Sequence, residues 1–398
     1  MNKIKKINQI DLRGKRVLIR VDFNVPINGN EISSDFRLKA SMKTIKYCIK
    51  EKSKIIIMSH LGRPKSNESN LSLHPIYLYL KKYFDKNNVI FSKDCISKKS
   101  INISKNLNPT EIHLLENLRF HSGELNNSET FAFKLSQHAE IYINDAFGTS
   151  HRSHASNSSI LNFFKKKCFG FLMDKEFNCL KNLKLNKKFG IILGGAKVST
   201  KLGMINHFID KADSIFIGGG MSFTFLKSMN KKIGNSLFEK KMLGIAKDTL
   251  EKSISSKTKI FLPEDFVCSK EISSSSNIEE KSINDFAQDD IGLDIGSKTI
   301  DLFLNEIKSL EKIIWNGPMG FFEIDLYKNG TAKLAEFISN LSSNNKLTSI
   351  IGGGDTVSAI IELGLSNNFT HISTGGGASL KLLSGEKLEL VQSWGNND

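Results

Sequence analysis

Cysteine, proline and tryptophan are scarce in this chain: its 398 residues include five cysteines, six prolines and two tryptophans. The cysteines are odd in number and no two form a Cys-x-x-Cys pair, so the sequence favours neither a disulfide framework nor a zinc site. Reduced thiols in a cytoplasmic protein are the plainest interpretation of Cys48, Cys95, Cys168, Cys179 and Cys268.

Long apolar runs are lacking as well. No stretch approaches the roughly 20 apolar residues that a membrane-spanning helix needs. The basic residues 1–8 are not followed by the apolar core of a signal peptide. We therefore expect no membrane partner. Hydrophobic residues make up 39% of the chain and charged residues 24%, as in ordinary globular proteins, and the length predicts about two domains.

Positive charge is in excess, with a formal net charge of +15. Such a balance is typical of proteins that bind a polyanion, and a non-catalytic nucleic-acid-binding protein is one alternative. Lysine and asparagine, however, fill stretches expected at the surface, such as 165–167 and 345–346, and no basic arm with interleaved aromatic residues is present. We expect a lysine-rich surface and no nucleic-acid partner.

Short apolar runs predict strands throughout the chain. Those in the first half lie at 16–21, 54–59, 88–91, 111–115, 141–144 and 168–171; those in the second half lie at 189–193, 214–217, 258–262, 312–315, 348–351 and 371–373. Helical patterns separate several of them, which predicts parallel sheets built from βαβ units. The expected fold class is α/β, with two Rossmann-like, doubly wound parallel-sheet domains joined by a hinge helix within 174–188.

Polar residues follow the predicted strands of the first half. Asp22 and Asn24 come where the first strand ends, ahead of Pro26, which blocks further strand pairing. Later strands are followed by His60, Arg63, Arg119 and Arg152. Ligands bind at the carboxyl ends of strands in open α/β sheets, and arginine suits the bidentate binding of phosphate or carboxylate. The pattern predicts an anion site at this edge.

Arg37 is predicted in the first turn of a helix, where a cation opposes the helix dipole unless an anion lies nearby. His151 and His154 are three residues apart and form a partial metal pair, but the flanking Arg152 favours anion binding instead. A metal at His60 is an alternative that lacks a second histidine at ligand spacing in the same loop.

Glycine-rich loops follow the predicted strands of the second half. The segment Gly194–Lys201 carries Lys197 and Lys201, four apart, which we expect on one face of a first helical turn, where a phosphate chain binds. It is not a Walker A sequence. Segment 352–356 places Asp355 beside three glycines, where it can hold a hydrated Mg2+. Further glycine-rich loops lie at 218–220, 315–320 and 373–379. Together they predict a nucleotide site.

On these motifs, the chain resembles the phosphoglycerate kinase family. The matching segments span almost its whole length: 21–26, 59–64, 116–120, 144–156, 194–201, 216–220, 292–299, 315–323, 352–356 and 373–378. The pattern departs after Glu386, where the family continues with Leu-Pro-Gly and this chain has Leu388-Glu389-Leu390.

The resemblance implies two domain roles. Residues 1–173 would bind the triose phosphate, with the tail at 385–398 packing back on them, and residues 174–384 would bind Mg-nucleotide. The implied reaction is reversible transfer of a phosphoryl group from 1,3-bisphosphoglycerate to ADP, which gives 3-phosphoglycerate and ATP in glycolysis and gluconeogenesis. The enzyme would be a cytoplasmic, monomeric, Mg2+-dependent kinase with a carboxyl group as acceptor.

The resemblance also implies residue roles. The substrate-binding residues would be Asp22, Phe23, Asn24, Arg37, His60, Leu61, Gly62, Arg63, Arg119 and Arg152. Arg37 and Lys197 would act on the transferring phosphoryl group. The nucleotide-binding residues would be Lys201, Gly292, Asn316, Glu323, Gly353, Gly354, Asp355 and Thr356, with Asp355 on Mg2+.

Such a transfer needs no enzyme nucleophile, only alignment and neutralisation of spread negative charge. Because the two substrates would lie on different domains, the domains must close for in-line transfer. An inactive homologue is disfavoured because Arg37, Lys197 and Asp355 are all present. An NAD-dependent dehydrogenase is disfavoured because no Gly-x-Gly-x-x-Gly precedes an acidic residue at the required spacing.

Overall fold

The computed structural model describes residues 4–29, 31–66, 68–181 and 188–395. These residues form two compact units. The first unit contains the described residues up to Asn178 together with those from Lys387 onward, and the second runs from Cys179 to Glu386. Each unit is built on its own six-stranded sheet.

The first sheet has the strand order β5-β6-β4-β1-β7-β8 and all its strand pairs are parallel. Its strands are β1 (Arg16–Val21), β4 (Lys54–Met58), β5 (Val89–Phe91), β6 (Ile112–Leu114), β7 (Ile141–Asp145) and β8 (Lys166–Phe169). The hairpin β2 (Ile27–Asn28) and β3 (Glu31–Ile32) lies outside this sheet. The continuous apolar runs predicted these strands because strands of parallel sheets are buried on both faces.

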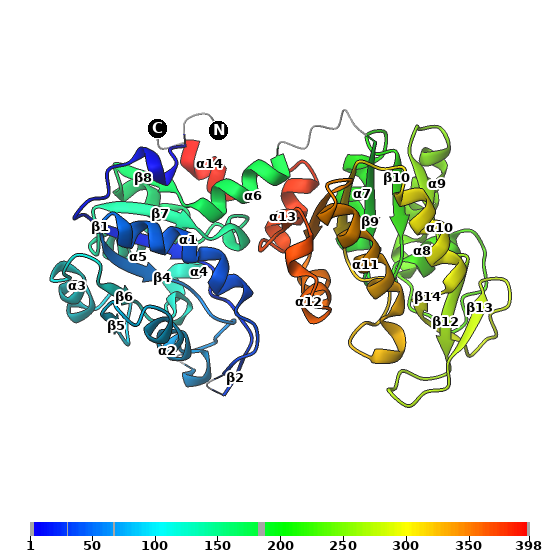
Figure 1. Ribbon diagram of the computed structural model, residues 1–398, viewed down its shortest axis with the longest axis horizontal. Coiled ribbons are helices and arrows are strands. Elements are labelled where there is room, and N and C mark those ends of the chain that lie inside the picture. The colour runs from blue at the N-terminus through cyan, green and yellow to red at the C-terminus, as the bar shows by residue number, and fades with distance from the viewer. Residues whose placement is uncertain (1–3, 30, 67, 182–187, 396–398) are drawn as a thin grey trace. The chain divides into compact units, whose positions relative to one another are not determined.

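Helices pack on this sheet (Figure 1). They are α1 (Phe36–Lys50), α2 (His74–Tyr83), α3 (Lys98–Lys105), α4 (Ser122–Leu125), α5 (Glu129–Ser136), α6 (Phe171–Lys181) and α14 (Glu389–Gly395). Helix α1 buries Leu38, Met42 and Ile45 against the core, because residues three or four apart share one helical face.

The chain returns to the first unit at its C-terminal end, where α14 lies beside α6 and β8 in Figure 1. The Trp394 ring meets Phe169 edge-on, with ring centroids 4.8 Å apart, and Leu390 N donates to the Ser150 carbonyl. Leu388 and Leu390, which stand where the family has Leu-Pro-Gly, are both buried. The departure from the family sequence therefore leaves the tail with an apolar anchor on this unit.

The second sheet has the order β11-β10-β9-β15-β16-β17, again with parallel pairs throughout. Its strands are β9 (Phe189–Leu193), β10 (Ser214–Ile217), β11 (Lys259–Phe261), β15 (Lys312–Asn316), β16 (Thr348–Gly352) and β17 (His371–Ile372). The two parallel sheets confirm the predicted α/β class with two Rossmann-like domains. The predicted strand ends differ from these bounds by two residues at most.

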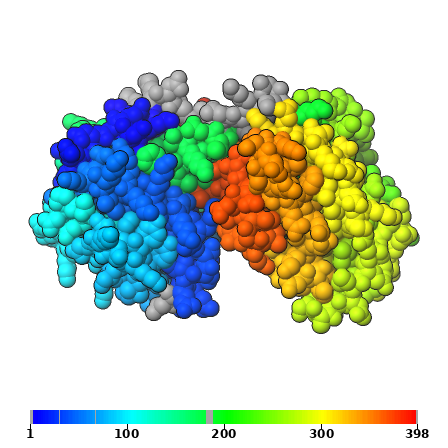
Figure 2. Space-filling view, in the orientation of Figure 1, coloured from blue at the N-terminus to red at the C-terminus, as the bar shows by residue number. Residues whose placement is uncertain are grey.

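The helices of this unit are α7 (Leu202–Phe208), α8 (Ser222–Ser228), α9 (Leu243–Ile254), α10 (Ser297–Ile307), α11 (Asn329–Ser343), α12 (Gly354–Glu362) and α13 (Gly377–Leu383). Figure 2 shows that segments coloured yellow to orange, which include α10, α11 and α12, form much of the visible surface of this unit.

A third sheet, which the sequence did not predict, is antiparallel and has the order β13-β12-β14. Its strands are β12 (Asp265–Ser269), β13 (Glu279–Ser282) and β14 (Ile291–Ile295). It packs around the rings of Phe223, Phe266 and Phe286. The segment 270–278 connects β12 to β13.

The predicted hinge helix at 174–188 corresponds in part to α6, which ends at Lys181. The remainder up to residue 187 lies outside the described residues. Among the described helices, none is both long and apolar enough to cross a membrane.

Candidate functional site

The first candidate site lies at the carboxyl ends of the strands in the first sheet. Strand β1 ends one residue before Asp22, and β4 and β6 end shortly before His60 and Arg119. Because β1 pairs with β4, and β4 with β6, these strand ends lie along one edge of the sheet. The register of the sheet thus gathers residues that are far apart in the sequence.

Asp22 lies at the centre of this site and is 4% exposed. Its Oδ2 atom pairs with the Arg37 guanidinium at 3.3 Å, and Arg37 also donates to the Asn24 carbonyl at 3.1 Å. The anion expected near Arg37, at the first turn of α1, is therefore partly supplied by the protein itself. Asn24 in turn accepts a hydrogen bond from Gly62 N at 2.9 Å, which ties the β1 and β4 loops together.

His60 is buried and faces Arg20, a residue that sequence reasoning missed. Arg20 is fully buried on β1, and its Nη2 atom lies 3.2 Å from His60 Nδ1. A guanidinium can only donate, so His60 Nδ1 accepts and its remaining proton is on Nε2. Burial, followed by the charges of Arg20 and Arg119, lowers the pKa of His60 well below its usual value. His60 is thus a neutral imidazole that offers an N–H donor.

Arg20 is held by buried partners. Its Nε donates to Ser156 Oγ at 2.9 Å, and its Nη2 lies 3.9 Å from the Glu124 carboxylate, which is itself fully buried. Glu124 also accepts from the Ser156 backbone and side chain. The sequence did contain a signal for Arg20, because it is a charged residue inside an apolar strand and therefore needs a buried partner such as Glu124.

Arg119 is the residue of this site best arranged to bind an anion. Its Nη1 donates to the Gly62 carbonyl, whereas Nε and Nη2 are buried and have no hydrogen-bond partner in the described part of the chain. Burial, then the charges of Arg152 and Arg20, lowers its pKa to about 10. Buried donors without acceptors are costly, so this guanidinium is arranged for an acceptor from outside the protein.

The other cations of the cluster lie close enough to repel one another. Burial, then the charge of Arg63, lowers the pKa of Arg152. Burial, then the charges of Arg20 and Arg119, lowers the pKa of His154 to about 3. The structure thus brings Arg119, Arg152 and His60 together as the sequence predicted, and repulsion between the two guanidinium groups favours a bound anion.

The remaining residues predicted to bind substrate differ in exposure. Phe23 and Leu61 are buried in the core cluster, and their backbone N–H groups donate to Ser59 Oγ and Asn117 Oδ1. Gly62 has φ of +60°. Arg63 is exposed. Their predicted contacts with substrate stay predictions.

The second candidate site is built from backbone. Glycine-rich loops follow β9, β10, β15 and β16, at one edge of the second sheet. A Cβ atom added at Gly194 would lie 2.0 Å from the Pro318 carbonyl oxygen, so the loops after β9 and β15 touch through their main chains. Gly194 N donates to the Asn316 carbonyl at 3.0 Å, and Gly195 N to that of Pro318 at 2.9 Å.

Lys201 and Asn316 form the polar centre of this site. Lys201 Nζ donates to Asn316 Oδ1, and the buried Asn316 Nδ2 has no hydrogen-bond partner among the described residues. Burial lowers the pKa of Lys201 to about 8, against the opposing effect of the Asp355 charge. Thr356 is buried and accepts from Gly317 N at 2.6 Å, which joins the β15 and β16 loops.

One local expectation about the lysines is wrong. Lys197 and Lys201 do not share the first turn of one helix: they flank the 3-10 turn Val198–Thr200, and α7 begins only at Leu202. Lys197 is exposed, whereas Lys201 is partly buried. Ser199 N donates to Glu239 Oε2 at 2.9 Å, which satisfies an N–H group at the start of this turn.

The other predicted nucleotide residues surround this centre. Gly353, with φ of +88°, caps α12, and Gly354 and Asp355 lie exposed in its first turn. Glu323 is exposed in the loop after β15. Gly292 is on β14, and a Cβ atom there would meet the Phe223 ring at 2.2 Å. Packing of the unpredicted antiparallel sheet therefore already requires glycine at 292.

The donor set at Asp355 fits a magnesium ion that is shared with phosphates. Among the described residues, no group of three or more histidine, cysteine or acidic side chains could hold a metal alone. Mg2+ usually keeps several waters and uses one or two carboxylates together with substrate phosphates. A single exposed carboxylate in the first turn of α12 matches that requirement.

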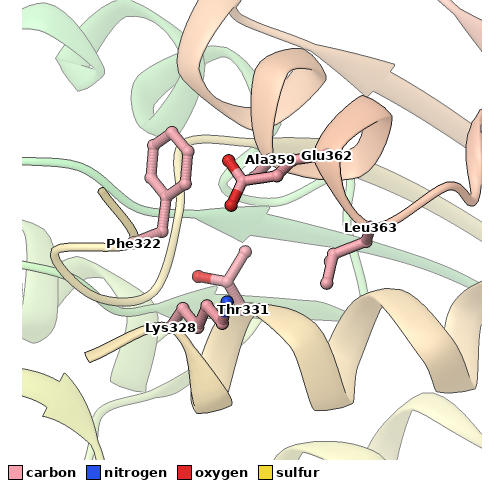
Figure 3. A pocket seen from close by; sticks show the side chains of 6 residues that line it. All are labelled: Phe322, Lys328, Thr331, Ala359, Glu362 and Leu363. Atoms are coloured by element: carbon pink, nitrogen blue, oxygen red, sulfur yellow. The ribbon is translucent and has the colours of Figure 1, made fainter. Parts of the chain in front are cut away.

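A small pocket lies in the second unit between α11, α12 and the loop after β15 (Figure 3). It is lined by Phe322, Lys328, Thr331, Ala359, Glu362 and Leu363. None of the predicted nucleotide residues lines it, although Thr331 Oγ1 accepts from Met319 N at 2.9 Å and so supports their loop.

The comparisons with known proteins agree across the chain. The family model described as phosphoglycerate kinase matches residues 7–386. A phosphoglycerate kinase of Finegoldia magna is 46% identical over 392 residues, covering 98% of each chain. One of Dictyoglomus turgidum is 45% identical over 380 residues, covering 95% of each.

Solved structures agree too. The phosphoglycerate kinase of Coxiella burnetii matches with a TM-score of 0.86 and 32% identity, over 99% of each chain. That of Pyrococcus horikoshii matches with a TM-score of 0.85 and 27% identity, over 98% of each.

Proposed function

The chain belongs to the phosphoglycerate kinase family, and we propose that its first unit binds the three-carbon phosphate while its second unit binds the Mg-nucleotide. The activity of the family is phosphoryl transfer between 1,3-bisphosphoglycerate and ADP, a step of glycolysis, and the chain is a kinase of this type. The roles of individual residues are the subject of the proposal.

The observation that carries the assignment of the first unit is the guanidinium of Arg119, which has two buried nitrogens without acceptors. A phosphate or carboxylate group offers the paired oxygens that this fork needs. Arg63 and Arg152 would bind the same anion, and neutral His60 would donate through Nε2. Asp22 and Asn24, beside Arg37, would meet the hydroxyl and carboxylate region, and Phe23, Leu61 and Gly62 would line the same site.

In the second unit, the partly buried Lys201 supports binding of nucleotide phosphates, and Asn316, whose Nδ2 has no partner among the described residues, would lie near the ribose. Gly353, Gly354 and Thr356 would hold phosphate oxygens at the first turn of α12, where backbone N–H groups point outward. Asp355 would hold Mg2+, which neutralises phosphate charge. Gly292 and Glu323 would lie near the nucleoside.

The transfer itself would be direct. Arg37 on the first unit and Lys197 on the second would neutralise the transferring phosphoryl group, and no covalent enzyme intermediate is required. In-line transfer needs reacting atoms roughly 3–3.5 Å apart. Since the ligands are assigned to different units, we propose that the two units close around them, with α6 in the hinge, and exclude water.

The proposal extends to partners and location. The substrates are 3-phosphoglycerate or 1,3-bisphosphoglycerate with ADP or ATP, and we propose a cytoplasmic monomer without nucleic-acid or membrane partners. The buried thiols of Cys48, Cys95, Cys168 and Cys268 suit a reducing compartment.

The experiment that tests this function is a coupled assay of ATP consumption that depends on 3-phosphoglycerate, repeated with Arg119→Met. We expect saturable activity in the native chain. The variant should bind 3-phosphoglycerate more weakly and leave the KM for ATP unchanged. Unchanged affinity for 3-phosphoglycerate would contradict the assignment of the first unit.

A further inference from the structure

The first unit contains a chain of hydrogen bonds that the reaction does not use. Ser92 Oγ lies 2.5 Å from His113 Nε2, and His113 Nδ1 lies 2.8 Å from Ser104 Oγ. Ser104 Oγ then lies 2.6 Å from His138 Nδ1, and His138 Nε2 lies 3.0 Å from the Cys95 carbonyl. Both imidazoles are fully buried.

The direction of every proton in this chain follows from its last member. A carbonyl can only accept, so His138 carries its proton on Nε2 and accepts at Nδ1 from Ser104. Ser104 then accepts from His113 Nδ1, and His113 Nε2 accepts from Ser92. The network is fully satisfied only when both imidazoles are neutral and in these tautomers.

The network joins four separate segments at one edge of the sheet. Ser92 follows β5, which is the edge strand, and His113 is on the neighbouring strand β6. Ser104 is on α3, and His138 follows α5. The loop between β5 and α3 is therefore held at both Ser92 and Cys95. We call Ser92, His113, Ser104 and His138 the histidine staple.

We propose that the histidine staple is an acid-sensitive set of hydrogen bonds that holds β5 and α3 on the rest of the first unit. When solvent protons protonate its imidazoles, β5 and α3 detach before the rest of the first unit unfolds. A proton added to either ring places a positive charge in the core and forces at least one hydroxyl to reverse.

The charges around the staple oppose that proton. Burial, then the charge of His138, lowers the pKa of His113 to about 3. Burial likewise lowers the pKa of His138 to about 4. Arg16 on β1 and Lys105 at the end of α3 act in the same direction on His138, and Asp94 in the β5–α3 loop acts against them.

The sign of the effect follows from linkage. Histidine in an open segment has a pKa near 6.5, so the open form binds protons that the closed form refuses. Stability of the edge is complete above that value and falls as the pH drops below it. At pH 5.0, each released histidine favours opening by roughly 30-fold.

The test is hydrogen exchange of the whole chain, compared as protection factors at pH 7.5 and 5.0. We expect protection in 89–105 to fall at least roughly 30-fold at pH 5.0 and to be lower there than protection in the interior strand β7 of the same unit. The double variant His113→Gln and His138→Gln should lose most of this pH dependence. A matched control is His121→Gln, which removes the partly exposed imidazole that lies 3.4 Å from Asp94 and should leave the pH dependence intact.

Two results would overturn the proposal: protection in 89–105 that is equal to or higher than that in β7 at pH 5.0, or a double variant with the pH dependence of the native chain. If the double variant does not fold, 15N shifts of the two rings in the native chain decide instead. We expect His113 protonated on Nδ1 and His138 on Nε2 down to pH 5.5, and titration of either ring near pH 6.5 in the closed form would also overturn the proposal.

Discussion

The two candidate sites present different kinds of groups to an anion. The site in the first unit is made of side chains: guanidinium groups and a neutral imidazole, packed so closely that burial and mutual repulsion lower their pKa values. The site in the second unit is made mainly of backbone, with glycine loops in direct contact around Lys201 and Asn316.

This difference predicts which kind of mutation weakens binding at each site. A side-chain site is damaged by deleting one charge, because each guanidinium supplies several donors. A backbone site is damaged by adding atoms, because its donors belong to the main chain and its spacing depends on missing Cβ atoms. The following predictions test that contrast, from the largest expected effect to the smallest.

Arg37→Ala should have the largest effect. We expect kcat to fall roughly 10²–10³-fold, the usual effect of removing one donor that stabilises transition-state charge. Nucleotide affinity should change little, because Arg37 belongs to the first unit and pairs with Asp22. Steady-state kinetics and calorimetric titration with MgADP measure the two quantities, and a near-normal kcat would contradict the role of Arg37.

Gly353→Ala should weaken nucleotide binding at the second site because it adds a Cβ atom. The backbone at 353 has φ of +88°, and a Cβ atom there would lie 3.0 Å from Asn316 Oδ1. Such strain costs about 1–3 kcal/mol, which would weaken nucleotide binding roughly 5- to 150-fold. The KM for 3-phosphoglycerate should stay unchanged. Gly364→Ala is a matched control, since it also has positive φ but lies beyond the far end of α12; equal effects of both variants on nucleotide binding would contradict the prediction.

Asp355→Ala tests whether the second site needs a charged side chain at all. We expect the Mg2+ concentration for half-maximal activity to rise roughly tenfold, the effect of about 1.4 kcal/mol. Titration of activity with Mg2+ at fixed ATP measures it. If the variant needs no more Mg2+ than the native chain and binds MgADP equally well, Asp355 is not the metal ligand.

Two buried carboxyl groups give the units a shared pH response. Asp145 on β7 accepts from Leu172 N and Met173 N of α6, and Asp294 on β14 accepts from Gly330 N of α11. Burial raises the pKa of each to about 7.

Both groups bind protons more tightly in the folded state, so their contribution to stability is complete below pH 4 and is lost as the pH rises to about 7. The variants Asp145→Asn and Asp294→Asn should therefore be less destabilised, relative to the native chain, at pH 8 than at pH 5. Denaturant unfolding at the two pH values measures this, and an equal or larger destabilisation at pH 8 would refute it.

Closure of the two units should give the smallest measurable change, a decrease in the radius of gyration. Either ligand alone contacts mainly one unit and gains little from closure, whereas both together favour the closed form. We expect the radius of gyration in solution scattering to decrease most with 3-phosphoglycerate and Mg-nucleotide together. An unchanged radius in an active ternary complex would argue against hinge closure.

The sequence predicted most of the scaffold because buried parallel strands are continuous apolar runs. Strands such as β1 and β9 were located with their exact bounds. In the antiparallel sheet, β13 was missed because it reads Glu-Glu-Lys-Ser, with its two glutamates exposed, and carries no apolar pattern. The local conformation around Lys197 and Lys201 was also missed, since Glu239 holds Ser199 from 40 positions away.

By itself, the sequence determined which chemical groups end each strand: arginines and a histidine in the first half, glycines and lysines in the second. Only the tertiary structure decided which of them touch. Arg20 meets Ser156, 136 positions along the chain, and His113 meets Ser92 and Ser104. The reason is physical: strand register and helix packing set distances between remote side chains, and burial then sets their charge. The composition of the sequence and the spacing of its motifs specify neither these distances nor these charges.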